Sequence, residues 1–133
     1  MNNKILIVSS NYYTQISNNL EKGTIDTLQE HGFDYDLINA PGCFEIPYLI
    51  KKNIDKYEGF ISLGCIIKGE TYHFEVISNE TSRKIMDLSL EYNIPIGFGI
   101  LTCYDLNQAI IRSDTNQKNK GREAALACIQ LLK

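Results

Sequence analysis

The nine residues GFISLGCII, at positions 59–67, decide the fold of this 133-residue chain. They form an apolar run that lacks the polar and apolar alternation of a strand with one face in water. Strands of this kind lie in parallel sheets that are covered by helices on both faces. Two further runs have the same character, ILIV at 5–8 and IPIGFGIL at 94–101. We therefore expect a parallel sheet with helices on both sides.

The stretches around these runs complete an alternation of strands and helices. FDYDLINA at 33–40 alternates as a fourth strand would. Apolar residues recur at helical spacing in five other stretches, which are 16–28, 43–54, 74–92, 105–111 and 122–132. Gly32 is placed to end the first helix, and Asp105 to cap the fourth. This order predicts an α/β fold, a three-layer αβα sandwich of the flavodoxin-like type with a central four-stranded parallel sheet.

Composition is that of one ordinary globular domain, which we expect to span residues 1–133 because no repeat or linker interrupts it. With 44% hydrophobic residues and a net charge of −3, the chain is neither disordered nor basic enough to favour nucleic acid as a partner. The apolar runs are too short for a membrane span, and MNNKILIVSS at 1–10 is too weakly apolar for a signal peptide. We expect a cytoplasmic protein without a membrane partner.

The sequence gives little sign of a metal or an organic cofactor. Cys43, Cys65, Cys103 and Cys128 are far apart and form no C-x-x-C pair, so we expect buried, reduced thiols. No His, Asp and Glu cluster has the spacing of a metal site. The loop SSNYYTQ at 9–15 contains no glycine, which disfavours the phosphate-cradling loops of nucleotide-binding folds. A metal site and the ordinary nucleotide cofactors are therefore disfavoured.

Four loops should form the ligand site, because parallel sheets bind ligands beyond the carboxyl ends of their strands. They are SSNYY, APGCFE, KGETYH and LTCYD, at 9–13, 40–45, 68–73 and 101–105. In the first loop, Tyr12 and Tyr13 offer aromatic area for stacking on a flat heterocycle. A tyrosine that simply packs on the adjacent loop fits this segment equally well.

The third loop has the most chemical content. Gly69, Glu70 and Thr71 are expected to open a long helix, where free backbone N–H groups and a hydroxyl could bind an anion. His73 would lie beside that anion as a group that can accept and return a proton. The same spacing also fits a capped helix end with a surface histidine.

The polar stretch IRSDTNQKNKGRE at 111–123 contains four cations between two helices. Arg112 suits bidentate phosphate contact and Lys120 adds a point charge. Because most charge clusters are merely solvated, that alternative stays open for this segment as well.

Four ordered segments together resemble the lumazine synthase family, and the match runs nearly from end to end. APGCFEIP at 40–47 resembles the family segment P-G-[AS]-F-E-[IL]-P, and LGCIIKGETYHFEVI at 63–77 resembles its central histidine-containing block. IPIGFGILT at 94–102 and QAIIRSDTNQKNKGREAA at 108–125 are similar to two further family motifs. The order and the intervals make the resemblance specific, whereas one motif alone would be weak.

The resemblance implies a transferase of riboflavin biosynthesis. Family members condense 5-amino-6-(D-ribitylamino)uracil with L-3,4-dihydroxy-2-butanone 4-phosphate to give 6,7-dimethyl-8-ribityllumazine, releasing phosphate and water without a metal or organic cofactor. They form pentamers whose active sites are shared between neighbouring subunits, and some stack these into decamers or sixty-subunit shells. Riboflavin synthase is a candidate partner enzyme.

The resemblance also implies which residues bind the substrates. The substrate-binding positions it carries over are Tyr12, Cys43, Phe44, Glu45, Cys65, Ile66, Ile67 and Phe98. Tyr12 would stack on the pyrimidine ring, Glu45 would accept hydrogen bonds from the ribityl chain, and the backbone from Cys65 would meet the pyrimidine edge. Phe98 would come from the neighbouring subunit.

A second group of positions concerns phosphate and proton transfer. The phosphate-binding positions that the resemblance implies are Glu70, Thr71, Arg112 and Lys120, with Arg112 again supplied by the neighbour. His73 matches the family's acid/base histidine, and we expect it to be the catalytic residue.

Four departures from the family pattern bear on assembly and binding. Asn116 stands where many members have lysine, and Gln117 and Lys118 replace a small residue and glycine. The chain also begins almost directly at its first strand. These features favour a pentamer over a shell. Tyr13 replaces asparagine beside the stacking aromatic, which changes the hydrogen bonding there without removing activity.

Two other classes of function compete with this interpretation. An archaeal-type riboflavin synthase would have no phosphate to hold, which conflicts with GETYHF at 69–74 and with Arg112 and Lys120. A binding module is the other class, either a degenerate relative that holds flavin or lumazine or a receiver domain. A receiver would need acidic residues at the strand ends, and VSSNYY at 8–13 has none.

Overall fold

Four parallel strands form the centre of the molecule in a computed structural model that describes residues 4–133. The strands are β1 (Lys4–Ser10), β2 (Asp34–Ala40), β3 (Gly59–Ile67) and β4 (Ile96–Cys103). Their spatial order is β2-β1-β3-β4, which is a flavodoxin-like order. The predicted α/β sandwich is therefore confirmed. Residues 1–3 of the expected domain lie outside the described part.

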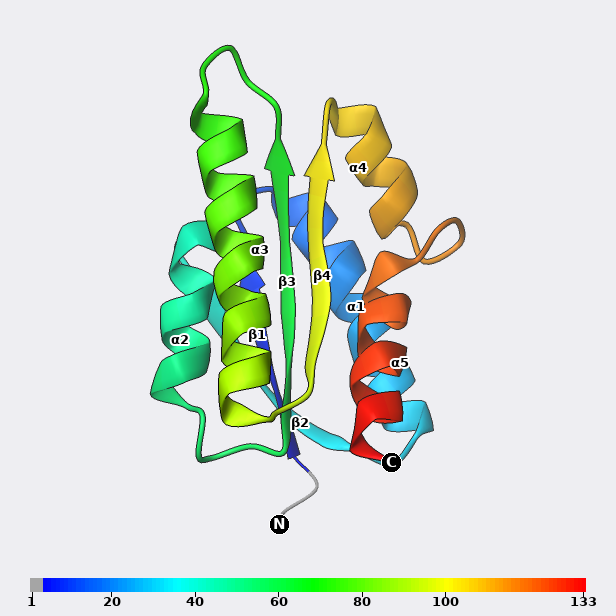
Figure 1. Ribbon diagram of the computed structural model, residues 1–133. Helices are drawn as coiled ribbons and strands as arrows, with labels where there is room; N and C mark the ends of the chain where they lie inside the picture. Colours follow the sequence, from blue (N-terminus) through cyan, green and yellow to red (C-terminus); the bar gives the residue numbers. More distant parts are fainter. Residues whose placement is uncertain (1–3) are drawn as a thin grey trace.

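Helices cover both faces of this sheet. They are α1 (Thr14–Glu30), α2 (Ile46–Lys52), α3 (His73–Tyr92), α4 (Leu106–Ser113) and α5 (Lys120–Leu132), with a short 3₁₀ turn η1 (Cys43–Glu45) before α2. Figure 1 shows α2 and α3 together on one side and α4 and α5 on the other, with α1 behind the strands. Contacts place α1 against α5 and α2 against α3, so the molecule has three layers.

The central strand β3 explains why the sequence there is continuously apolar. Ile61 and Leu63 point into a core cluster with α1 and α5, whereas Phe60 and Ile66 point into a second cluster with α2 and α3. Both faces of the strand are therefore buried, and alternation is unnecessary. None of the helices within residues 4–133 combines the length and apolar character that crossing a membrane requires.

Helix boundaries confirm some sequence signals and correct others. Asp105 caps α4 by accepting a hydrogen bond from the Gln108 backbone N–H at 2.9 Å. Gly32 has a φ of +77° just after α1, as a helix-ending glycine should. The long helix α3, however, begins at His73, and not at Gly69–Thr71. Residues 69–72 are exposed, so this segment has no apolar side chain with which to dock on the sheet.

A second correction concerns the residues after Pro41 and Gly42. The apolar spacing predicted one short helix from 43 to 54, but the first three residues form the 3₁₀ turn η1. A 3₁₀ turn directs its side chains differently from an α-helix. Phe44 is consequently 53% exposed, while Ile46 and Ile50, which belong to α2, are fully buried.

Candidate functional site

A cavity of about 500 Å³ lies at the carboxyl ends of β1, β2 and β3. In Figure 1 the arrowheads of β3 and β4 point to this end, where the loop into α3 and the start of α4 also lie. The volume of the cavity is within the range of pockets that hold small organic ligands. The residues that line it are Ser10, Tyr12, Tyr13, Pro41, Gly42, Cys43, Phe44, Glu45, Cys65, Ile66, Ile67, His73 and Ile77.

Eight of the thirteen residues expected from the sequence line this cavity. They are Tyr12, Cys43, Phe44, Glu45, Cys65, Ile66, Ile67 and His73. Five of them come from three of the four expected loops, and Cys65, Ile66 and Ile67 come from the end of β3. The fourth loop, LTCYD, contributes none. Ser10 and Tyr13, which belong to the first expected loop, also line the cavity, although the family resemblance assigned no binding role to either. The position of both at the carboxyl end of β1 was the available signal.

The turn η1 places a thiol and a carboxylate on one wall. The Cys43 sulfur packs so closely on β3 that a Cβ atom at Gly64 would lie 2.5 Å from it. Burial raises the pKa of the Cys43 thiol to about 11, although Ser10 and the Cys65 backbone act in the opposite direction. Cys43 is therefore a neutral wall group at physiological pH. Glu45 is exposed at the edge of the same turn.

Two adjacent tyrosines form the wall that follows β1. Their rings meet edge to face, with centroids 5.0 Å apart and an interplanar angle of 80°. Tyr12 is 73% exposed, so its ring area is open to a ligand. Tyr13 is partly buried and packs against the core cluster on the α1 side of the sheet.

His73 is the first residue of α3 and its side chain is exposed beside the cavity. The Thr71 hydroxyl accepts a hydrogen bond from the His73 backbone N–H at 3.4 Å, so it caps the helix start weakly. Glu70 and Thr71 are themselves exposed and do not line the cavity. The imidazole thus lies at the border between the cavity and the loop at 69–72.

The base of that loop is braced by one cation. Lys68 Nζ lies 2.8 Å from a Glu75 carboxylate oxygen and 5.5 Å from the centroid of the Phe74 ring. The Lys68 backbone N–H also donates to the Cys103 carbonyl at 2.9 Å. These contacts hold both ends of the loop, while residues 69–72 between them remain exposed.

All four cysteines are free and buried, as the sequence predicted. Burial, together with the nearby Cys103 and Cys43 thiols, raises the pKa of Cys65 to about 12. Burial also raises the pKa of Cys128 to about 12. Because the thiolate is the nucleophilic form, these groups are unreactive near neutral pH. The cavity thus contains a possible proton carrier in His73 but no activated protein nucleophile.

Three expected residues lie away from the cavity within one chain. Arg112 is on α4, which packs with α1 and α5 on the opposite face of the sheet from α3, and donates to the Gln108 carbonyl at 3.2 Å. Lys120 begins α5 and pairs with Glu123 at 3.1 Å. Phe98 is 45% exposed on β4, an edge strand. One chain therefore does not bring these residues to His73.

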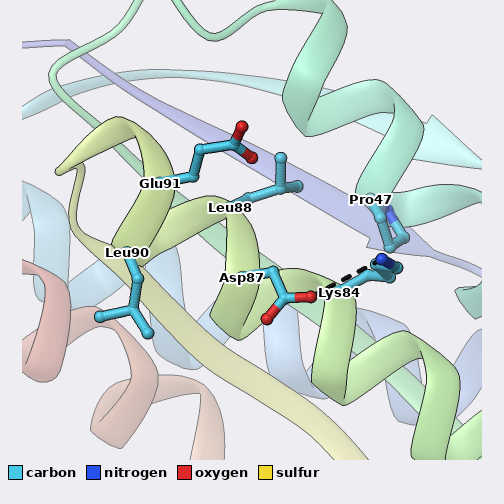
Figure 2. Close-up of a pocket in the computed structure, with 6 residues that line it drawn as sticks. All are labelled: Pro47, Lys84, Asp87, Leu88, Leu90 and Glu91. Atoms are coloured by element: carbon cyan, nitrogen blue, oxygen red, sulfur yellow. Dashed lines mark ion pairs between the residues drawn. The ribbon is translucent and has the colours of Figure 1, made fainter.

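A second hollow, of about 550 Å³, lies between α2 and α3 and is shown in Figure 2. Its lining residues are Pro47, Lys84, Asp87, Leu88, Leu90 and Glu91. Lys84 and Asp87 form an ion pair of 3.7 Å on its wall, which Figure 2 marks with a dashed line. The hollow contains no imidazole, hydroxyl or thiol and lies along the helices, away from the strand ends, so we assign the site to the cavity. Among residues 4–133, no three His, Cys, Asp or Glu side chains gather as a metal site.

Comparisons with known proteins agree with the motifs that line the cavity. The family model described as 6,7-dimethyl-8-ribityllumazine synthase matches residues 2–133. A protein of that name from Bartonella bacilliformis is 42% identical over the whole of this chain and 92% of the relative. One from Bartonella tribocorum is 44% identical over 97% of this chain and 89% of the relative. One from Agrobacterium fabrum is 41% identical over 96% and 91% of the two chains.

Proposed function

The chain belongs to the 6,7-dimethyl-8-ribityllumazine synthase family, and we propose that the cavity at the ends of β1, β2 and β3 is where its substrates are bound. The protein is an enzyme, a transferase of riboflavin biosynthesis. It condenses 5-amino-6-(D-ribitylamino)uracil with L-3,4-dihydroxy-2-butanone 4-phosphate to 6,7-dimethyl-8-ribityllumazine, releasing phosphate and water. Neither a riboflavin synthase nor a non-catalytic binding protein fits a family match of this length and identity.

The observation that carries the site proposal is the convergence of eight expected residues on one cavity. The aminouracil would fill it, with the pyrimidine ring on the exposed Tyr12 and the ring edge against the backbone of Cys65–Ile67. Phe44 and Cys43 would flank the ribityl chain, and Glu45 would accept hydrogen bonds from its hydroxyls. The predominantly apolar lining with a few polar groups suits such a ligand.

The reaction does not require a nucleophile from the protein, because the amine of the uracil attacks the ketone. The protein instead holds two substrates together and moves protons. His73 would take and return protons as the Schiff base forms with loss of water, and again in the enolisation that accompanies loss of phosphate. Its exposed position at the cavity border suits that role.

The phosphate of the second substrate would bind beside His73. Glu70 would contribute its backbone N–H, and Thr71 its hydroxyl and backbone N–H. Arg112 and Lys120 would supply the positive charge that balances the phosphate, both as bound ester and as leaving group.

We propose that Arg112 and Phe98 reach this site from a neighbouring subunit, with Lys120 completing the phosphate clamp. Their distance from the cavity within one chain supports this, since the sheet separates α4 from α3. Membership of the family implies an oligomer, and we propose a homopentamer. The full 133 residues would form one domain per subunit. A cytoplasmic location fits four free thiols, which persist in reducing compartments.

The experiment that tests the function combines two readouts in one assay. The purified protein is mixed with the aminouracil and the butanone phosphate, and lumazine absorbance and free phosphate are followed together. We expect equal amounts of both products, formed faster than in the uncatalysed background. Phosphate release without lumazine, or no acceleration at all, would contradict the function.

A variant of Arg112 tests the shared phosphate clamp. Arg112→Ala should raise the KM for the butanone phosphate and leave the KM for the aminouracil unchanged. Arg83→Ala is the matched control, because Arg83 is exposed on α3 and pairs with its helical neighbour Glu80. A rise confined to the aminouracil would remove Arg112 from the clamp.

A further inference from the structure

We infer that the Tyr13 hydroxyl is a further substrate-positioning group, which donates a hydrogen bond to the ribitylaminouracil. The inference rests on the proposed function of the cavity. No motif assigns a role to Tyr13, since asparagine is the usual residue at this position of the resembled family. The structure nevertheless places Tyr13 among the residues that line the cavity, next in sequence to the exposed Tyr12.

The Tyr13 ring is held on two sides. One side packs against the core cluster that includes Ile5, Ile16 and Cys65. On the other side it meets the Tyr12 ring edge to face at 5.0 Å. Its backbone is extended, with φ −104° and ψ 94°, immediately before α1 begins. A tyrosine has only two side-chain torsions, so these contacts fix where its hydroxyl lies.

That hydroxyl has no hydrogen-bond partner within residues 4–133. Partly buried tyrosine hydroxyl groups usually have one. The neighbouring wall groups do not satisfy it, because the Cys43 and Cys65 thiols are weak acceptors. The hydroxyl is also absent from the fully buried unpaired atoms of this chain, so it is open to the cavity or to solvent. A ligand in the cavity that offers an oxygen acceptor can therefore take the hydrogen bond of this hydroxyl.

The phenol is available as a donor over the whole physiological pH range. Burial raises its pKa above the ordinary value, and the nearby Cys65, Tyr12 and Cys43 side chains act in the same direction. The group therefore stays protonated and neutral. A neutral donor suits a carbonyl or hydroxyl oxygen better than it suits a phosphate, which requires positive charge.

The neighbours of Tyr13 favour the aminouracil as the ligand that it contacts. Cys65 belongs to the proposed pyrimidine edge and Cys43 to the proposed ribityl segment, and both thiols lie near Tyr13. The expected phosphate-binding residues Thr71, Arg112 and Lys120 do not line this cavity. Carbonyl and hydroxyl acceptors are abundant on a ribitylated pyrimidine, so the donor has a partner there.

The test is Tyr13→Phe, which removes the hydroxyl and keeps the ring. Loss of one neutral hydrogen bond predicts a rise of about three- to tenfold in the KM and in the dissociation constant for the aminouracil. The KM for the butanone phosphate and the kcat should stay within about twofold of wild type. Tyr48→Phe is the matched control, because Tyr48 is 67% exposed on α2 and lies outside the cavity.

Binding of the aminouracil alone is measured by titration calorimetry alongside turnover. The inference would be overturned if wild type and Tyr13→Phe had the same KM for the aminouracil. It would also be overturned if the KM values for the two substrates rose equally in Tyr13→Phe. So would a lowered melting temperature of Tyr13→Phe with unchanged affinity, because that result assigns the hydroxyl to stability. A wild-type protein that binds the aminouracil but makes no lumazine refutes the proposed function, and the calorimetric comparison then still decides the role of Tyr13. Failure of wild type to bind would overturn both.

Discussion

The two ends of the sheet carry tyrosines in opposite situations. At the amino end, the Tyr57 hydroxyl donates to Asp36 Oδ2 at 2.6 Å, and Lys4 Nζ lies 3.4 Å from the same oxygen. At the carboxyl end, Tyr13 is similarly half-buried, but its hydroxyl has no partner within residues 4–133. The tyrosine at the amino end therefore has its hydrogen-bond partner within the chain, whereas the tyrosine at the carboxyl end has a hydroxyl that a ligand can satisfy.

This difference teaches how to separate polar groups that serve the fold from those that serve binding. A partner within the chain compensates desolvation in the absence of any ligand, so the group stabilises the folded state. A partly buried group without such a partner gains its compensation only when something enters the cavity. Substitutions at the amino end should therefore change stability, and matched substitutions at the carboxyl end should change catalysis or binding.

The largest effect is expected from the two histidines, which lie at opposite ends. His73→Ala should lower kcat about 100-fold, because it removes the proposed proton carrier. His31→Ala should leave kcat unchanged, since among the described residues the His31 ring forms a single hydrogen-bond contact, from Nδ1 to the Thr27 carbonyl at 2.9 Å. Steady-state turnover of lumazine measures both.

His73 is exposed, so its replacement should not alter the melting temperature. A His73→Ala enzyme with wild-type turnover would remove the imidazole from the mechanism. If His31→Ala lost as much turnover as His73→Ala, the two ends of the sheet would not differ in their importance for catalysis.

Two glycines of β3 sharpen the comparison within a single strand. A Cβ atom at Gly64 would lie 2.5 Å from Cys43 Sγ, and one at Gly59 would lie 2.8 Å from Cys128 Sγ. Alanine at either position should lower the free energy of unfolding by about 1–3 kcal/mol, because it overpacks the core. Only Gly64→Ala should also raise the KM for the aminouracil, since Cys43 forms a cavity wall.

Urea unfolding and steady-state kinetics on the two variants give these values. If Gly59→Ala raised the same KM equally, the effect would be a general consequence of lost stability. If neither variant lost stability, the packing at β3 would be looser than the contacts indicate.

Much of the fold could be predicted because burial on both faces leaves a simple trace in the sequence. The continuous apolar runs identified β1, β3 and β4, and Asp105 identified the start of α4. The start of α3 was wrong because it depends on which side chain first docks on the sheet, and residues 69–72 have none that does. Phe44 was misassigned because a helical spacing does not distinguish an α-helix from a 3₁₀ turn.

The site was predictable to the extent that it follows the strand ends. The rule that ligands bind beyond parallel strands selected the loops that supply Tyr12, Glu45 and His73 to one cavity. The same rule selected the loop that contains Tyr13, but it did not reveal the role of the Tyr13 hydroxyl, because an unpaired hydroxyl is a property of three-dimensional surroundings. Arg112 belongs to one of the family motifs but lies on the opposite face of the sheet from α3. The role we propose for it depends on a second chain, which the sequence pattern does not place.

A smaller effect is expected from Tyr57→Phe, which breaks the paired end. The loss of its hydrogen bond should lower the free energy of unfolding by about 1 kcal/mol at pH 7, because partial solvent exposure keeps such a bond modest. The bond to Asp36, with burial, raises the pKa of Tyr57 to about 12, from an ordinary value of 10.0. The stabilisation is therefore full below pH 10 and is lost as the pH rises to about 12.

Thermal unfolding of wild type and Tyr57→Phe between pH 7 and 12 measures this difference. Ionisation of the buried thiols destabilises wild type and variant alike over a similar range of high pH. Only the difference in stability between the two proteins therefore reports on Tyr57. Tyr13→Phe serves as the matched control and should unfold as wild type does. A constant difference up to pH 12 would contradict the paired state of Tyr57.

The smallest effect is expected at the carboxylate of the same cluster, in Asp36→Asn. The hydrogen bond from Tyr57, followed by the contact with Lys4, lowers the pKa of Asp36 below its ordinary value of 3.8. A lowered pKa means that the stabilisation is present above pH 3.8 and disappears as the pH falls through the folded-state value. Because the Asp36 side chain is 44% exposed, water screens both contacts and the gain in stability is slight.

Asp34→Asn is the control, since Asp34 is exposed in the same strand and forms no ion pair within residues 4–133. Unfolding curves should show Asp36→Asn less stable than wild type at pH 7, with a smaller difference at pH 3. Asp34→Asn should equal wild type at pH 7. A loss of stability in Asp36→Asn that persists unchanged at pH 3 would mean that the asparagine disturbs packing, and that the charge of Asp36 is not what stabilises the amino end.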